Sequence, residues 1–122
     1  MTIYAVGLGP GDPDYLAPGA KEAILCSDVI VGYTVYIELI SGLLDGKQVI
    51  ATGMKSEAMR CEAAVVEAVK GKQVCVVSSG DAGIYGMAAL LYELAEKHPE
   101  IEIEVLPVSQ RQPQQRQNWD RP

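Results

Sequence analysis

The sequence is poor in the residue types on which several protein classes depend. It has three cysteines, an odd number without a Cys-x-x-Cys pair, so neither a disulfide framework nor a zinc site is indicated. We predict that Cys26, Cys61 and Cys75 are buried free thiols in a reducing cytoplasm. The only histidine, His98, precedes a proline, where a helix is expected to end. No metal site is predicted.

Positive charge and long apolar runs are also scarce. Ten lysines and arginines stand against sixteen aspartates and glutamates, and the net charge of −6 argues against a nucleic-acid-binding surface. No apolar run approaches the roughly 20 residues of a membrane span, and no secretory signal is visible, so a cytoplasmic protein is expected. A 122-residue chain with 48% hydrophobic and 21% charged residues is typical of one globular domain.

The chain does contain short apolar segments that alternate with helical patterns. Strands are predicted at 2–8, 29–31, 48–51, 73–78 and 101–105. Helical patterns lie between them, at 19–26, 33–44, 56–70 and from about Gly86 to Leu94. This alternation predicts an α/β fold, a mainly parallel five-stranded sheet with helices on both faces. The very apolar 73–78 is expected to be central, and 101–105, where Glu102 and Glu104 alternate with apolar residues, an edge.

Two of the predicted helices have clear apolar faces. The helix after Ser56, its expected N-cap, is predicted to stop at Gly71. Its apolar stripe is Met59, Ala63, Val66 and Val69, and that of the last helix is Met87, Leu90, Leu91 and Leu94. Such stripes normally face a core.

The most informative feature is a pair of glycine-rich loops, each following an apolar strand. One is Gly7–Pro13 (Gly-Leu-Gly-Pro-Gly-Asp-Pro), and the other is Ser78–Gly86 (Ser-Ser-Gly-Asp-Ala-Gly-Ile-Tyr-Gly). In a parallel sheet, ligands bind outside the carboxyl ends of the strands. Glycine lets the main chain approach a ligand closely. The two loops therefore predict two walls of one small-molecule site.

Two common nucleotide-binding motifs are disfavoured. The first loop places Asp12 where the Rossmann fingerprint needs a third glycine for close helix–strand packing. Gly46-Lys47 and Gly71-Lys72 are each followed by glutamine and lack the upstream glycine of a P-loop. These pairs are better interpreted as turn glycines beside surface lysines.

Taken together, the two loops resemble the tetrapyrrole methylase family. The family opens with a strand and Gly-x-Gly-Pro-Gly-Asp-Pro, as at Gly7–Pro13, and its second mark is a Gly-Asp loop, as at Gly80-Asp81. Three segments, 31–36, 53–61 and 77–88, resemble its precorrin-3B C(17)-methyltransferase branch in cobalamin biosynthesis. The resemblance runs from Ile3 to Pro107.

The resemblance implies S-adenosylmethionine as cofactor. The family's cofactor contacts fall on Pro10, Gly80, Asp81 and Ile84, where main-chain groups and the Asp81 carboxylate would hold the ligand. A second interpretation of Asp81 stays open: a turn residue that caps the helix beginning near Gly86.

The implied substrate is a macrocyclic tetrapyrrole with many carboxylates. Candidate substrate-binding residues are Asp12, Lys55, Arg60 and Tyr85. Asp12 is equally explained as a turn residue, and Lys55 and Arg60 as solvated surface charges. Methyl transfer needs alignment of nucleophile, methyl group and sulfur, so positioning can supply much of the acceleration and no catalytic triad is predicted.

Residues 108–122 are predicted to be a disordered tail outside the family pattern. Apart from Trp119, residues 109–122 carry no large apolar side chain. Asn118-Trp119-Asp120 must be encoded AAY-TGG-GAY, and a frame one base earlier reads Leu-Gly. The same frame gives alanine or threonine at the Gln-Arg and Gln-Gln junctions. A frameshift near Pro107 is therefore our hypothesis, and sequencing the gene tests it.

The function expected from the resemblance is S-adenosylmethionine-dependent methylation of a precorrin-3B-type tetrapyrrole, with ring contraction. In the family the ligands lie between two domains, usually in a homodimer, so residues 1–107 correspond to the N-terminal domain and little activity is expected from this chain alone. Two alternatives stay open: another branch of the family, acting on a different tetrapyrrole carbon or on diphthamide, and a non-catalytic ligand-binding module.

Overall fold

The computed structural model describes residues 1–9, 16–54 and 56–108. The predictions for Pro10, Asp12, Lys55 and the tail at 109–122 therefore lie outside the described residues. The elements, in chain order, are β1 (Thr2–Gly7), α1 (Pro18–Cys26), β2 (Val29–Tyr33), α2 (Thr34–Leu39), the 3-10 turn η2 (Ser41–Leu43), β3 (Gln48–Thr52), α3 (Glu57–Val69), β4 (Val74–Ser78), α4 (Asp81–Leu94), the 3-10 turn η3 (Ala95–Lys97) and β5 (Glu102–Leu106).

The five strands form one sheet in the order β3-β2-β4-β1-β5, and every pairing is parallel. All residues of β4 are buried, which confirms the prediction that the apolar segment 73–78 is central. β5 forms an edge, as predicted, with Glu102 and Glu104 exposed. The α/β class with a parallel five-stranded sheet is confirmed.

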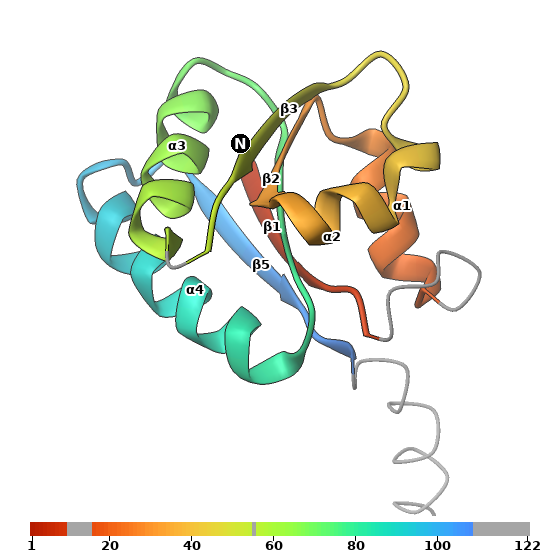
Figure 1. Ribbon diagram of the computed structural model, residues 1–122. Coiled ribbons are helices and arrows are strands. Elements are labelled where there is room, and N and C mark those ends of the chain that lie inside the picture. Colours follow the sequence, from red (N-terminus) through yellow and green to blue (C-terminus); the bar gives the residue numbers. More distant parts are fainter. Residues whose placement is uncertain (10–15, 55, 109–122) are drawn as a thin grey trace, which may run out of the picture.

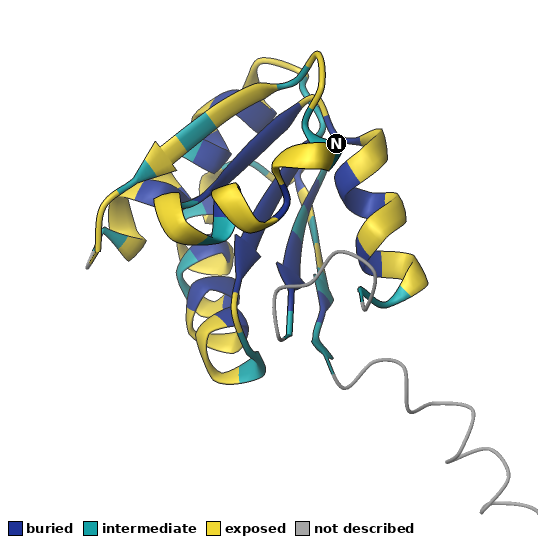
Figure 2. Ribbon diagram, turned by 45° about the vertical axis from the view of Figure 1, so that its right-hand side comes forward, coloured by how far each residue is buried: buried dark blue, intermediate teal, exposed yellow. Residues whose placement is uncertain are grey.

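The helices cover both faces of the sheet, as predicted (Figure 1). α3 and α4 pack on one face against Ile3, Val31 and Val76. α1 packs on the other face, against Val6 and Val77, and the chain around α2 lies on the same side. Figure 2 shows the resulting layers, with the buried central strands between helices whose outer faces are exposed, whereas the edge strand β3 is largely exposed.

The predicted apolar stripe of α3 is wrong. Met59, Val66 and Val69 are 62%, 52% and 44% exposed. The buried face of α3 consists mainly of small residues, together with two charged ones: Arg60, Cys61, Ala64, Val65, Glu67 and Ala68. Small side chains let α3 approach the sheet and α4 closely, whereas periodicity weighted by large apolar residues indicates the opposite face.

The start of α4 also differs from the prediction. The helix begins at Asp81, not near Gly86, although its apolar face is as expected, with Met87 and Leu91 buried. Gly83 lies in the first turn of α4, where the helix passes close to β4. A Cβ atom at Gly83 would lie 2.5 Å from Ser78 Oγ. The glycines that suggest a loop thus allow a close helix–strand contact.

The predictions for the two ends of α3 have different outcomes. Gly71 ends α3 with a φ of +96°, as predicted. Ser56 occupies the N-cap position, but its hydroxyl donates to Met54 O at 3.5 Å instead of capping the helix. No described helix is long and apolar enough to cross a membrane.

The three cysteines are free, but only two are buried. Burial raises the pKa of the Cys61 thiol to about 11 and that of the Cys75 thiol still further. The prediction is wrong for Cys26, which lies exposed in the last turn of α1. The described residues contain no group of ligands that would hold a metal ion.

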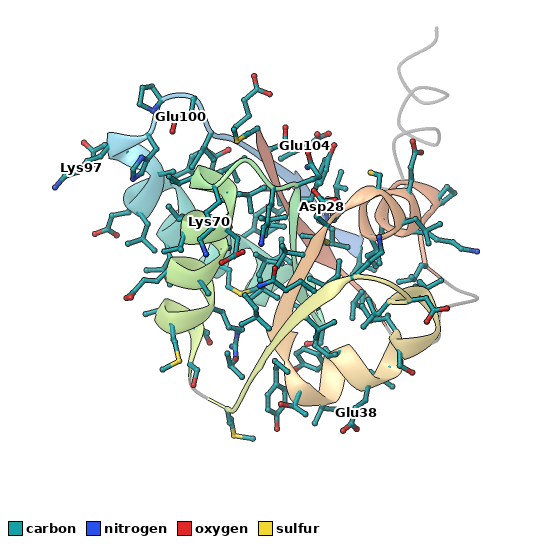
Figure 3. All side chains as sticks on the ribbon, turned by 90° about the horizontal axis from the view of Figure 1, so that it is seen from above. Asp28, Glu38, Lys70, Lys97, Glu100 and Glu104 are labelled. Atoms are coloured by element: carbon teal, nitrogen blue, oxygen red, sulfur yellow. The ribbon has the colours of Figure 1, made fainter. Side chains whose placement is uncertain are left out.

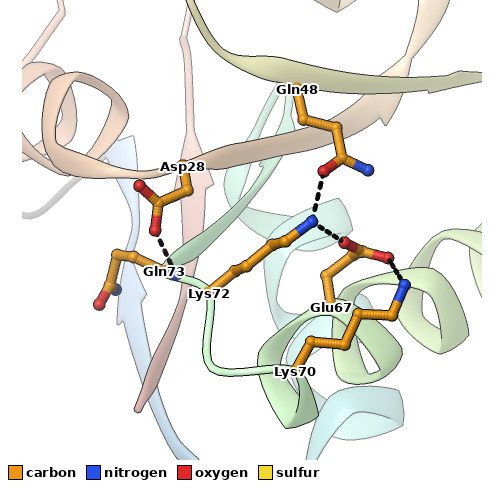
Figure 4. A network of polar contacts seen from close by, with 6 residues as sticks. All are labelled: Asp28, Gln48, Glu67, Lys70, Lys72 and Gln73. Atoms are coloured by element: carbon orange, nitrogen blue, oxygen red, sulfur yellow. Dashed lines mark hydrogen bonds and ion pairs between the residues drawn. The ribbon is translucent and has the colours of Figure 1, made fainter.

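The amino-terminal end of the sheet is closed by paired charges (Figure 4). Buried Glu67 accepts hydrogen bonds from Lys72 and Lys70, each at 3.0 Å. These bonds lower the pKa of Glu67. Nearby, Asp28 Oδ2 accepts the main-chain N–H of Gln73 at 2.9 Å. This network joins the end of α3 to the starts of β2 and β4.

Candidate functional site

The two glycine loops lie side by side at the carboxyl end of the sheet. β1 pairs with β4, with Gly7 opposite Ser78. Beyond the strands, Leu8 N donates to Ser78 O at 2.8 Å and Gly9 N donates to Ser79 O at 2.9 Å. For residues 7–9 and 78–86, this juxtaposition confirms the arrangement predicted from the sequence.

The topology predicts two crevices at this end. The chain leaves β4 toward α4 on one face, whereas it leaves its neighbours β2 and β1 toward α2 and α1 on the other. Where the chain leaves two adjacent strands toward opposite faces of the sheet, the loops that follow the strands diverge, and ligands bind between these loops. The β4/β1 crevice carries the glycine loops, and the β2/β4 crevice lies next to it.

The β4/β1 crevice contains the predicted cofactor residues that the structure describes. A Cβ added at Gly80, the N-cap of α4, would have no atom within 4 Å, so its surroundings are open. The second interpretation of Asp81, as a turn residue that caps the helix, is wrong. Asp81 Oδ1 instead accepts the N–H of Val108 at 2.6 Å. A carboxylate has a second oxygen that can accept from a ligand.

Ile84 lies beneath the crevice and not in its wall. Its side chain is fully buried, and its N–H donates to Gly80 O at 3.1 Å. A Cβ at Gly7 would lie 3.5 Å from Ile84 Cγ1 and 3.0 Å from Val108 Cγ2. Glycine at position 7 therefore makes room for α4 and the chain after β5. Ile84 supports this loop through packing.

The β2/β4 crevice holds a pocket of about 300 Å³. Its lining residues come from β2, α2, α3, β4 and α4 and from the loops after β3 and β4: Tyr33, Tyr36, Met54, Glu57, Arg60, Ser78, Ser79, Gly83 and Met87. The rings of Tyr33 and Tyr36 meet edge to face, with centroids 5.3 Å apart. Polar and aromatic groups thus converge on one concave site.

Arg60 is the cation among the described residues that line this pocket. It is only 7% exposed, so the interpretation as a solvated surface charge is wrong. Its Nη1 donates to Thr52 Oγ1 at 2.7 Å and to Gly53 O at 3.1 Å. The other described substrate candidate, Tyr85, is 55% exposed on α4 and does not line the pocket.

The two tyrosines of the pocket wall were not predicted as site residues, and its two serines were predicted only as part of the second glycine loop. Tyr33 ends β2, and Ser78 and Ser79 follow the apolar core of β4. Their positions at the carboxyl ends of neighbouring strands were the available signal, but the order of strands in the sheet was needed to use it.

The fold and these crevices define an α/β domain with a candidate small-ligand site at the carboxyl end of its sheet. Residues 2–108 match the family of tetrapyrrole (corrin/porphyrin) methylases. The chain belongs to this family. The resemblance inferred from the two glycine loops is thereby confirmed.

Curated relatives cover the same region. The chain is 47% identical over 110 residues to the cobalt-factor III methyltransferase of Priestia megaterium, covering 86% of this chain and 20% of that protein. It is 43% identical over 106 residues to the probable cobalt-factor III C(17)-methyltransferase of Salmonella typhimurium, covering 86% and 44%. The chain therefore spans less than half the length of these relatives.

Solved structures share the fold. The methyltransferase CobJ superposes with a TM-score of 0.72 at 38% identity, over 88% of this chain and 45% of that one. The cobalt precorrin-4 methyltransferase CbiF gives a TM-score of 0.71 at 25% identity, over the same shares.

Proposed function

We propose that this chain is the N-terminal domain of an enzyme that methylates a tetrapyrrole in cobalamin biosynthesis, at C17 and with ring contraction. The observation that carries the proposal is the 43–47% identity to two cobalt-factor III methyltransferases over 106–110 residues. Because both of these relatives are named for cobalt-factor III, we favour a cobalt-containing substrate over the metal-free precorrin-3B.

We propose S-adenosylmethionine as the methyl donor. Its sulfonium supplies a methyl group that a carbon nucleophile displaces from sulfur, with S-adenosylhomocysteine as the second product. The β4/β1 crevice fits part of such a ligand, since Gly80 is open and Asp81 offers an acceptor beside the first turn of α4. Ile84 would act through packing, because its side chain is buried and its N–H is bonded to Gly80 O.

The family match at residues 2–108 supports a domain spanning 1–107. Pro10, Asp12 and Lys55 stay candidates for ligand contact, as does Tyr85 for the substrate. The homodimer expected from the family resemblance also stays a prediction.

A chimera tests the proposed function directly. Residues 1–107 replace the aligned part of the Salmonella typhimurium relative, and transfer of a labelled methyl group from S-adenosylmethionine to cobalt-factor III is measured. We expect turnover, and we expect Asp81→Asn to reduce it, while Asp45→Asn, at an exposed turn, leaves it unchanged. A folded chimera that binds S-adenosylhomocysteine but transfers no methyl group would contradict the assignment.

A titration tests the need for further ligand contacts. The 122-residue chain is titrated calorimetrically with S-adenosylhomocysteine, and weak or undetectable binding is expected because the described crevice supplies contacts from one side only. Tight binding would show that this domain forms a complete cofactor site.

A further inference from the structure

We infer that Arg60 binds a carboxylate of the ligand in the β2/β4 pocket, so that this pocket takes one acidic side chain while the β4/β1 crevice takes the methyl donor. The identity of the acidic ligand as a tetrapyrrole rests on the proposed function. The presence of a carboxylate site rests only on the charge, burial and contacts of the pocket.

The first step is that Arg60 is buried without a counter-charge among the residues that the structure describes. Both of its hydrogen bonds among the described residues go to neutral oxygens, those of Thr52 and Gly53. Glu57 lines the same pocket, but no carboxylate in the described part of the chain lies within 4.0 Å of the guanidinium. Arginine is seldom buried unless it is paired, because removing its charge from water is costly.

The second step is that the guanidinium is held in place with donors left over. Both bonds come from Nη1, whereas a guanidinium carries five N–H donors in a planar fork. Nε and Nη2 together match the two oxygens of a carboxylate, and such bidentate pairs are among the stronger hydrogen bonds. Thr52 and Gly53 orient Arg60, and an anion from outside completes its pairing.

The third step concerns the volume of the β2/β4 pocket and the residues that line it. A pocket of about 300 Å³ is at the lower end of the range for small-molecule sites, so it suits an acidic arm better than a whole macrocycle. The wall contains the hydroxyls of Ser78 and Ser79 as further donors, and the Tyr33–Tyr36 pair as an aromatic surface. These groups fit a propionate- or acetate-type side chain.

The experiment uses propionate and its uncharged isostere propionamide on the full 122-residue chain. Each is titrated at constant ionic strength, and the amide signals of Ser79 and Gly83 and the Nε–H signal of Arg60 are followed by NMR. We expect saturable shifts with propionate and none at the same sites with propionamide. Arg60→Gln should weaken propionate binding at least about tenfold. Arg60→Lys should retain part of it.

Lys97→Gln is the matched control, because Lys97 is exposed and its side chain points away from the body of the protein (Figure 3). It should leave propionate binding unchanged. Equal responses to propionate and propionamide, or equal losses in the Lys97 and Arg60 variants, would overturn the inference. If Arg60→Gln does not fold, the Nε–H response of the unmodified chain decides alone. None of these readouts needs the methyl donor, so this inference and the proposed function fail separately.

Discussion

Buried charged side chains have different kinds of partner at the two ends of the parallel sheet. At the amino-terminal end, Glu67 is paired with Lys70 and Lys72. At the carboxyl end, Arg60 is equally buried, but its partners are a hydroxyl and a carbonyl.

This difference distinguishes charges that stabilise the fold from a charge that is available to a ligand. A charge that is satisfied inside the chain fixes the ends of helices and strands, and it offers little to a ligand. A buried charge that lacks an internal counter-ion favours an external one. The glycines Gly7, Gly9 and Gly83 belong to the same carboxyl end, where the backbone approaches Val108 or Ser78 closely. The predictions below test how far this division holds.

The largest effect is expected for Ile84→Ala. If Ile84 is core and not ligand wall, removing its fully buried side chain should lower the free energy of unfolding by about 2–5 kcal/mol, measured by urea denaturation. Tyr85→Ala, at the exposed neighbouring position, should change it by less than about 0.5 kcal/mol. Similar small effects for both variants would place Ile84 outside the core.

Gly83→Ala comes next. The added methyl group would meet Ser78 Oγ, so we expect a loss of about 1–3 kcal/mol in unfolding free energy. Adding Ser78→Ala should restore it, because the next nearest atom is Ser78 Cβ at an ordinary 3.8 Å. A double-mutant cycle measures this coupling. Additive effects would mean that the serine does not cause the clash.

Glu67→Gln tests the amino-terminal end, with a smaller effect than either core change. Hydrogen bonds from Lys72 and Lys70 hold the pKa of Glu67 below its ordinary 4.5. The carboxylate therefore stabilises the fold above pH 4.5, and this contribution is lost as the pH falls through the lowered folded pKa. Urea denaturation at pH 7, 4.5 and 3 should show less acid destabilisation in Glu67→Gln than in the unmodified chain. Glu62→Gln, exposed on the same helix, should keep the original pH dependence.

The smallest effect is expected for Ser56→Ala. A working N-cap contributes about 1 kcal/mol, but the Ser56 hydroxyl makes no capping bond. The unfolding free energy should therefore change by less than about 0.5 kcal/mol. Gly71→Ala, at the other end of α3, should be more damaging because φ there is +96°. A loss of a full cap energy at Ser56 would show that its hydroxyl does cap the helix in solution.

Much of the fold and the β4/β1 part of the candidate site were predictable from local patterns in the sequence. The alternation of apolar strands with amphipathic helices predicted the parallel sheet, and the composition of 73–78 predicted its central strand. The glycine loops predicted the β4/β1 crevice, because carboxyl ends of parallel strands share one edge. The pocket between β2 and β4 was not predictable, since those strands are neighbours only through the strand order β3-β2-β4-β1-β5.

The sequence by itself determined the succession of strands and helices, the family membership and the loops at one end of the sheet, because periodicity and glycine position are local properties. Only the tertiary structure decided that α3 buries Cys61 and Ala64 instead of Met59 and Val66, that Asp81 bonds Val108, and that Arg60 is buried with Thr52 and Gly53 as its described partners. Those outcomes depend on which neighbours leave room for each side chain, and neighbours distant in sequence are set by the packed fold.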